Sequence, residues 1–184
     1  MLGLVQHKNV DVDYWGVESG LVLTHLTIEH IKSRMNISNY YVFAFVRNPY
    51  NRIISEYNWR MRNRKAFEEP TGRRMRFTKY CELLYSKWDG LMNDPDMTNV
   101  KITNIQHIRP QSNYVDDDVE IYRHEDFDNE CLRIQGRLGI NVAIPKMNMA
   151  KYKTKHTDRT IEITNELYAE DFKTFGYDRI NNIK

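Results

Sequence analysis

The chain has 184 residues, a length that favours one compact domain over residues 1–184 and leaves little room for a second. Hydrophobic residues make up 41% and charged residues 28% of it, which excludes a disordered tail and a membrane bundle. No apolar run reaches the roughly 18 residues of a membrane-spanning helix, and two cysteines are too few for a disulfide scaffold. We therefore expect a soluble α/β domain without a transmembrane segment, whose formal net charge is only +2.

In the first half of the chain, the spacing of apolar residues predicts three helices and one strand. Residues 22–35 repeat apolar side chains at helical spacing. Residues 40–46 are β-branched and aromatic without polar alternation, a pattern typical of a parallel strand that is buried on both faces. Pro49 ends this strand, because the residue before a proline avoids the helical region. Amphipathic helices are then predicted at about residues 50–64 and 77–88.

The second half of the chain begins with another strand-to-helix unit. Residues 119–122 are predicted to form a second strand, and residues 126–138 a helix with one apolar stripe. Glu125 precedes this helix and is predicted to cap it. Gly139 follows this helix and is predicted to end it as a C-cap in the left-handed conformation.

The last predicted helix covers residues 158–175. Thr157 or Asp158 is its expected N-cap, and Gly176 its expected end. The alternation of strand and helix along the chain predicts an α/β fold with a parallel sheet.

One strand-to-helix turn carries a phosphate-binding signal. Arg47 lies at the carboxyl end of the first predicted strand, where open α/β sheets place their ligands. Ser55 lies two helical turns later, about 9 Å along the helix axis, within reach of an anion held by Arg47. A guanidinium fork, a hydroxyl and the free amides of a helix N-terminus all suit phosphate oxygens. The alternative is that Arg47 pairs with a core carboxylate and Ser55 only packs on a helix face.

Four stretches, in this order, resemble the sulfotransferases that use 3′-phosphoadenosine-5′-phosphosulfate (PAPS). The similarity is to their carbohydrate branch, which includes the heparan 2-O- and chondroitin 4-O-type enzymes. The patterns are V-R-N-P-Y-x-R-x-x-S-x-Y at 46–57, H-x-R-P-Q at 107–111, Y-R-H-E-D-F at 122–127 with L-G-I at 138–140, and Y-x-x-D-F-x-x-F-G-Y at 168–177.

The resemblance implies a P-loop-like α/β fold, with a central parallel sheet flanked by helices, and PAPS as co-substrate. It assigns the 3′-phosphate to Arg47 and Ser55. Lys151 and Lys153, in a late basic loop, are further candidate contacts to that phosphate; the alternative is a solvated connector. No metal is expected, because no nearby cysteine or carboxylate completes a zinc set with the histidines.

The chain departs from the family at the loop that holds the 5′-phosphosulfate. That loop has the form P-K-T-x-x-T-S, and it is absent here: none of the eight glycines precedes a lysine, and the one Pro-Lys pair lies at residues 145–146. In relatives the loop lies some tens of residues before the V-R-N-P segment, near Met1 of this sequence. We therefore expect an N-terminally truncated chain that lacks the first strand and its loop, or else an inactive relative.

Two histidines are candidates for the general base that takes the proton of the acceptor hydroxyl, because the ordinary pKa of histidine lies nearest neutrality. His25 matches the position that the resemblance gives to the base; alternatively, it caps a helix start. His107 is the second candidate, as base or as a sugar contact. Arg109 and Gln111 would then orient the acceptor, unless this segment is only a rigid loop.

A stretch rich in basic residues indicates what kind of acceptor the protein binds. Residues 52–79 hold nine basic and three acidic side chains, a local charge of +6 that attracts polyanions. This favours an anionic carbohydrate acceptor, although such a run is often only a solvated face. Three functions remain open: a PAPS-dependent carbohydrate sulfotransferase, a non-catalytic relative that binds a nucleotide or glycan, and, least favoured, a nucleic-acid-binding module, for which no recognition motif is present. The compartment is the cytoplasm for a bacterial enzyme or the Golgi lumen for a truncated eukaryotic type.

Overall fold

The computed structural model describes residues 17–18, 21–22, 26–34, 36–63, 75–93, 105–142 and 154–181. The strands within these ranges are β1 (Val17–Glu18), β2 (Leu21–Val22), β3 (Phe43–Val46) and β4 (Glu120–Arg123). The α-helices are α1 (Ile28–Lys32), α2 (Pro49–Asn63), α3 (Phe77–Met92), α4 (Ile105–Ile108), α5 (Phe127–Leu138), α6 (Asp158–Leu167) and α7 (Ala169–Phe175). Two short 3₁₀ helices, η3 (Gln111–Tyr114) and η4 (His124–Asp126), lie on either side of β4.

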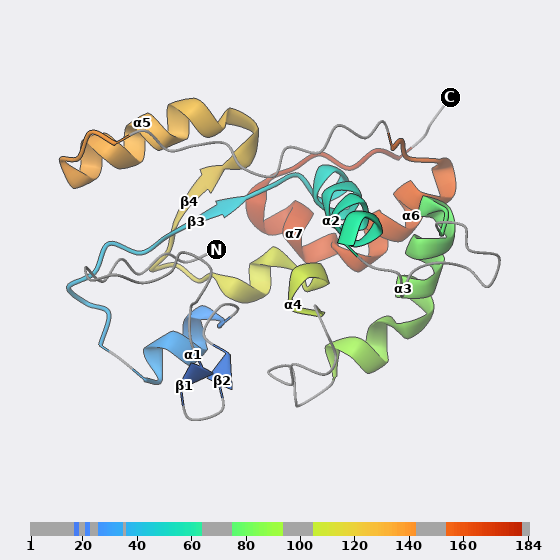
Figure 1. Cartoon of the computed structure of the whole chain (residues 1–184), viewed down its shortest axis with the longest axis horizontal. Helices are drawn as coiled ribbons and strands as arrows, with labels where there is room; N and C mark the ends of the chain where they lie inside the picture. Colours follow the sequence, from blue (N-terminus) through green and yellow to red (C-terminus); the bar gives the residue numbers. More distant parts are fainter. Residues whose placement is uncertain are drawn as a thin grey trace.

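Strands β3 and β4 form a parallel pair, which confirms the predicted parallel arrangement (Figure 1). Phe43 pairs with Glu120 at one end and Val46 with Arg123 at the other. Both strands therefore end at the same edge, so the turn after Val46 and the turn after Arg123 lie side by side. This edge carries the candidate site.

The predicted helix at residues 22–35 is wrong in its first part. Leu21–Val22 forms a strand that pairs with Val17–Glu18 in antiparallel fashion, and the helix covers only Ile28–Lys32. Thr27 is its N-cap: the backbone there is extended, and the hydroxyl accepts a hydrogen bond from the His30 amide. Because the helix begins only after this N-cap, the helical spacing of the apolar residues before Thr27 does not correspond to a helix.

The predicted last helix is two helices, α6 and α7, that meet at Tyr168. The Tyr168 backbone leaves the helical region (φ −115°, ψ 28°), while its buried hydroxyl donates to the carbonyl oxygen of Ile108 at 2.8 Å. Both predicted ends are confirmed. Thr157 caps α6 in a capping box with Thr160, and Gly176 ends α7 in the left-handed conformation.

A helical core lies beside the β3–β4 pair and is built from α2, α3, α6 and α7, which group together in Figure 1. The α2 residues that face inward include Tyr50 and Ile53. They pack among the buried side chains of the other helices, which are Phe77, Tyr80, Cys81, Leu84, Ile161, Ile163, Leu167, Tyr168 and Phe172. Helix α2 thus joins the end of β3 to this core, and a rigid helix fixes what its first turns present.

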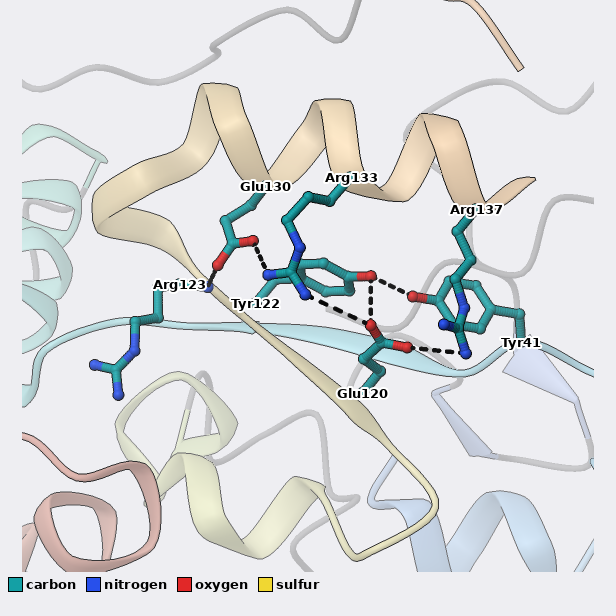
Figure 2. Close-up of polar contacts among 7 residues, drawn as sticks. All are labelled: Tyr41, Glu120, Tyr122, Arg123, Glu130, Arg133 and Arg137. Atoms are coloured by element: carbon teal, nitrogen blue, oxygen red, sulfur yellow. Dashed lines mark hydrogen bonds and ion pairs between the residues drawn. The ribbon is translucent and has the colours of Figure 1, made fainter. Parts of the chain in front are cut away.

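Helix α5 is fastened to the sheet by a polar network, drawn in Figure 2. The buried Tyr122 donates to Glu120 at 2.9 Å, and its hydroxyl also contacts that of Tyr41. Arg137, on α5, forms an ion pair with Glu120 at 3.4 Å. The hydrogen bond from Tyr122 and the arginine charges hold the pKa of Glu120 below its ordinary value. This network fixes α5, and with it the η4 turn at the carboxyl end of β4.

None of the described helices is long and apolar enough to span a bilayer. Among the described residues, no three His, Cys, Asp or Glu side chains gather as a metal site would require.

Candidate functional site

Arg47 follows β3 directly and precedes the N-terminus of α2. Asn48 caps that helix, its side-chain oxygen accepting from the Tyr50 amide at 3.0 Å. The Arg47 guanidinium is half-buried, and burial lowers its pKa, although the Glu125 charge acts in the opposite direction. Within the described ranges the guanidinium makes no ion pair or hydrogen bond, so the alternative of pairing with a core carboxylate is not what the structure shows. A half-buried cation without a partner is suited to binding an anion.

Ser55 lies in the second turn of α2 and is half-buried. In the part of the chain that the structure describes, its hydroxyl has no hydrogen-bond partner. Its donor is therefore open to a ligand, like the guanidinium of Arg47.

Glu125 was predicted to cap its own helix, and this is wrong: it caps α2 instead. Its Oε1 accepts from the backbone amide of Asn48 at 2.7 Å, and its Oε2 accepts from the Tyr177 hydroxyl at 2.9 Å. The reason is the parallel register, which places the end of β4 beside the start of α2. A carboxylate thus already lies at the helix N-terminus next to Arg47.

Gln111, predicted to orient an acceptor, lies with its side-chain amide against the backbone of Arg47. Its Oε1 accepts from the Arg47 amide at 2.9 Å, and its Nε2 donates to the Arg47 carbonyl at 2.8 Å. Asp171, fully buried on α7, accepts from the backbone amides of Gln111 and Ser112 at 2.9 and 2.8 Å. The His-x-Arg-Pro-Gln segment is therefore attached to the turn that is predicted to bind phosphate.

His107, a candidate base, faces a buried carboxylate from α2. Its Nδ1 lies 3.4 Å from Oε2 of Glu56, whose Oε1 accepts from Nε of the buried Arg60 at 2.6 Å. The His107 ring also packs on Trp59, with ring centroids 5.2 Å apart. Burial favours a raised pKa for Glu56, but the hydrogen bond to His107 and the Arg60 charge outweigh it, and the pKa is lowered. An imidazole whose Nδ1 is hydrogen-bonded to a carboxylate takes up a proton at Nε2.

Two arginines hold the His107 segment in place. Arg52, on α2, donates through Nη2 to the His107 carbonyl at 2.8 Å and lies over the Tyr168 ring. Arg109, a predicted acceptor contact, is half-buried and lies over the Tyr114 ring, with its pKa lowered by burial. The segment from His107 to Gln111 is therefore attached to α2 through Arg52 and to the backbone of Arg47 through Gln111.

In a comparison with protein-family profiles, residues 21–178 fit the profile described as "Sulfotransferase family". The chain belongs to this family. Its members transfer sulfuryl groups and generally take them from PAPS. No curated protein and no solved structure matched the chain.

Three predicted site residues of this sulfotransferase, His25, Lys151 and Lys153, lie outside the described residues. Sequence reasoning missed Glu56 and Asp171 and gave Glu125 the wrong partner. One signal could have identified Glu56: Arg52, Glu56 and Arg60 alternate in charge at intervals of four residues on a helix that otherwise faces a core.

The basic stretch of the sulfotransferase is not wholly a surface feature. Arg60 is only 6% exposed and pairs with Glu56, and Arg52 is directed at the His107 carbonyl. Arg62, Arg76 and Lys79 are exposed. The remaining basic residues of the stretch, Arg64, Lys65, Arg73 and Arg74, lie outside the described residues.

Proposed function

We propose that this sulfotransferase binds the 3′-phosphate of PAPS with Arg47 and Ser55 and transfers the sulfuryl group to a hydroxyl of a carbohydrate acceptor. One observation carries the proposal: a half-buried guanidinium without an ion-pair partner in the described chain lies at a sheet edge and a helix N-terminus. These features together favour an anion with several oxygens, as in a phosphate monoester. Lys151 and Lys153 are proposed as further contacts to it.

In this proposal His107 is the general base. The acceptor oxygen forms a bond to sulfur, the bond from sulfur to the leaving phosphate oxygen breaks, and the hydroxyl proton passes to Nε2 of His107. Support comes from Glu56, whose carboxylate contacts Nδ1 and so favours proton uptake at Nε2. His25 is the alternative base.

The carbohydrate acceptor rests on the resemblance to the carbohydrate branch, and an anionic acceptor on the exposed basic residues Arg62, Arg76 and Lys79. Arg109 lies in the same segment as His107 and is proposed to contact the acceptor.

The first test is calorimetric titration of adenosine 3′,5′-bisphosphate (PAP), the product nucleotide, into the protein and into Arg47→Ala. We expect Arg47→Ala to weaken binding roughly 10- to 100-fold, the cost of one or two charge-assisted hydrogen bonds. Arg159→Ala is the matched control, because Arg159 is exposed on α6, where it pairs with Glu162 and lies over the Tyr85 ring. Equal losses in the two variants, or no loss in Arg47→Ala, would exclude the proposed phosphate site.

The second test is transfer from PAPS to a panel of glycans. Transfer supports the enzyme, whereas PAP binding without transfer to any glycan favours the non-catalytic relative. Salt-sensitive binding of an oligonucleotide that Arg47→Ala leaves unchanged would favour a nucleic-acid-binding module instead.

A further inference from the structure

Arg47 is the residue at which β3 stops having a strand partner. The last pair in the register is Val46 with Arg123. The amide of Glu120 donates to the carbonyl of Val42, so the backbone groups of even-numbered β3 residues point toward β4. The backbone amide and carbonyl of Arg47 consequently point to the opposite edge, where no described strand lies.

Gln111 satisfies both of these backbone groups with one side chain. Its carboxamide accepts from the Arg47 amide at 2.9 Å and donates to the Arg47 carbonyl at 2.8 Å, which is what a neighbouring strand would do. Of the common side chains, only a carboxamide has a donor and an acceptor in this arrangement. The contact is made to the backbone of Arg47, whose guanidinium is proposed to bind the 3′-phosphate.

Gln111 is itself held at its backbone by α7. The buried Asp171 accepts from the Gln111 amide at 2.9 Å, and from both the amide and the hydroxyl of Ser112 at 2.8 Å. Gln111 is thus anchored through its backbone amide to Asp171 of the helical core and through its carboxamide to Arg47, and Nε2 also donates to Asp171 at 3.4 Å.

We infer that Gln111 is a positioning residue for the 3′-phosphate site, which fixes the backbone of Arg47 and hence the direction of its guanidinium. The inference rests on the proposed function and replaces the acceptor contact expected of Gln111. It also connects the segment of His107 to the nucleotide side of the site through a single amide.

The test is a double-mutant cycle on PAP binding with Gln111→Met, which keeps the length of the side chain. It removes the two hydrogen bonds to the Arg47 backbone and the 3.4 Å hydrogen bond from Nε2 to Asp171. Two backbone hydrogen bonds predict a loss of affinity of about tenfold. In the Arg47→Ala background the same substitution should change PAP affinity less than twofold, because Gln111 acts through Arg47. Thermal unfolding of each variant verifies that it is folded before titration.

A second ligand separates positioning from a general structural effect. Gln111→Met should weaken PAP but leave the affinity for adenosine 5′-phosphate, which lacks the 3′-phosphate, within twofold of wild type. Equal losses for both ligands, a full loss in the Arg47→Ala background, or no loss at all would overturn the inference. If Arg47→Ala itself leaves PAP binding intact, the proposed phosphate site fails, whatever Gln111→Met does.

Discussion

Glu56 and His107 come from different helices, and a carboxylate oxygen of Glu56 lies 3.4 Å from Nδ1 of His107. Arg60, Trp59 and the Arg52 side chain surround this pair from the same helix, α2. The pair is therefore held in place by the helix that also carries Ser55, the residue before Glu56, and that follows Arg47. The proposed base and the proposed nucleotide site thus share one rigid element, which is how transferring groups are kept in register.

The first prediction concerns this pair. His107→Ala should lower the rate of sulfuryl transfer by about 10²- to 10⁴-fold, the usual contribution of a general base. Glu56→Gln should lower it less, about tenfold, because the imidazole keeps its place but loses the carboxylate that selects its protonated nitrogen. Neither variant should change PAP affinity more than twofold, as measured by calorimetry.

Arg60→Met is the control for damage to the helix. Like Glu56→Gln, it breaks the buried ion pair between Arg60 and Glu56, but it leaves the Glu56 carboxylate facing His107. A rate loss in Arg60→Met as large as in Glu56→Gln would mean that the helix, and not the carboxylate, carries the effect. Full activity of His107→Ala would leave His25 as the base.

The second prediction concerns Glu125, whose carboxylate lies at the start of α2 beside Arg47. Its negative charge opposes the binding of a phosphate there, while the Oε1 acceptor of a glutamine can still satisfy the Asn48 amide. Glu125→Gln should therefore strengthen PAP binding about three- to tenfold at low salt, and less at high salt, as expected for a screened charge.

Asp117→Asn is its matched control, since Asp117 is exposed and precedes β4 at the end away from Arg47. It should leave PAP affinity within twofold. A PAP affinity of Glu125→Gln that is unchanged or weaker at low salt would contradict the prediction and show that the carboxylate supports the bound state.

The features of the fold that depend on neighbouring residues were predicted from the sequence better than those that depend on distant contacts. Gly139, Gly176 and Thr157 are helix ends that depend only on their own backbone and neighbours, and all three were predicted correctly. The break at Tyr168 could not be predicted, because it accompanies a hydrogen bond from a buried hydroxyl to a carbonyl 60 residues away. The helix predicted at residues 22–35 had helical spacing, but Thr27 caps it late.

In the candidate site, too, contacts within one segment could be predicted and contacts between distant segments could not. Arg47 and Ser55 share one continuous strand-to-helix segment, so their proximity could be argued from spacing. Gln111 approaches Arg47 from 64 residues away, and Glu125 approaches Asn48 from 77 residues away. Such contacts follow from the parallel register and the packing of α7, which no local pattern encodes.

The third prediction uses two glycines of α5. Gly139 is in the left-handed conformation (φ +65°), whereas Gly136 lies inside the helix, and a Cβ at either position would meet nothing within 4 Å. Gly139→Ala should lower the free energy of unfolding by about 1 kcal/mol, the cost of a left-handed alanine. Gly136→Ala should raise it by up to about 1 kcal/mol through helix propensity. Urea unfolding measures both, and equal signs would mean that the C-cap is not formed in solution.

The fourth prediction concerns His156, which lies between α2 and α6. Its Nε2 is 2.9 Å from the Tyr50 carbonyl, its Nδ1 is 3.1 Å from the Thr160 hydroxyl, and its ring packs on Phe77. Burial lowers the pKa of His156 below the ordinary value of 6.5, against a smaller opposing effect of the hydrogen bond to Tyr50. The folded protein therefore holds this imidazole neutral at pH values where the unfolded chain has already taken up a proton.

The sign of the pH dependence follows from that difference. Because the unfolded state binds more protons below pH 6.5, the contribution of His156 is complete above 6.5 and is lost as the pH falls toward the folded pKa. The free energy of unfolding should decrease on acidification by at most about 1.4 kcal/mol per pH unit from this group. Carboxylates with a lowered pKa, such as Glu56 and Glu120, lose their contributions to stability only below their ordinary pKa of 4.5. The pH range in which His156 acts is therefore separate from the range in which these carboxylates act.

His156→Gln is the variant that tests this assignment, because a glutamine can still donate to the Tyr50 carbonyl but does not titrate. It should be less stable than wild type at pH 8, since the ring contacts with Tyr50 and Phe77 are lost. Between pH 7 and pH 5, however, its stability should change less with pH than that of wild type. His124→Gln, at an exposed histidine of η4, should keep the wild-type pH profile. Parallel profiles for wild type and His156→Gln would show that the buried imidazole is not the group that makes the fold sensitive to mild acid.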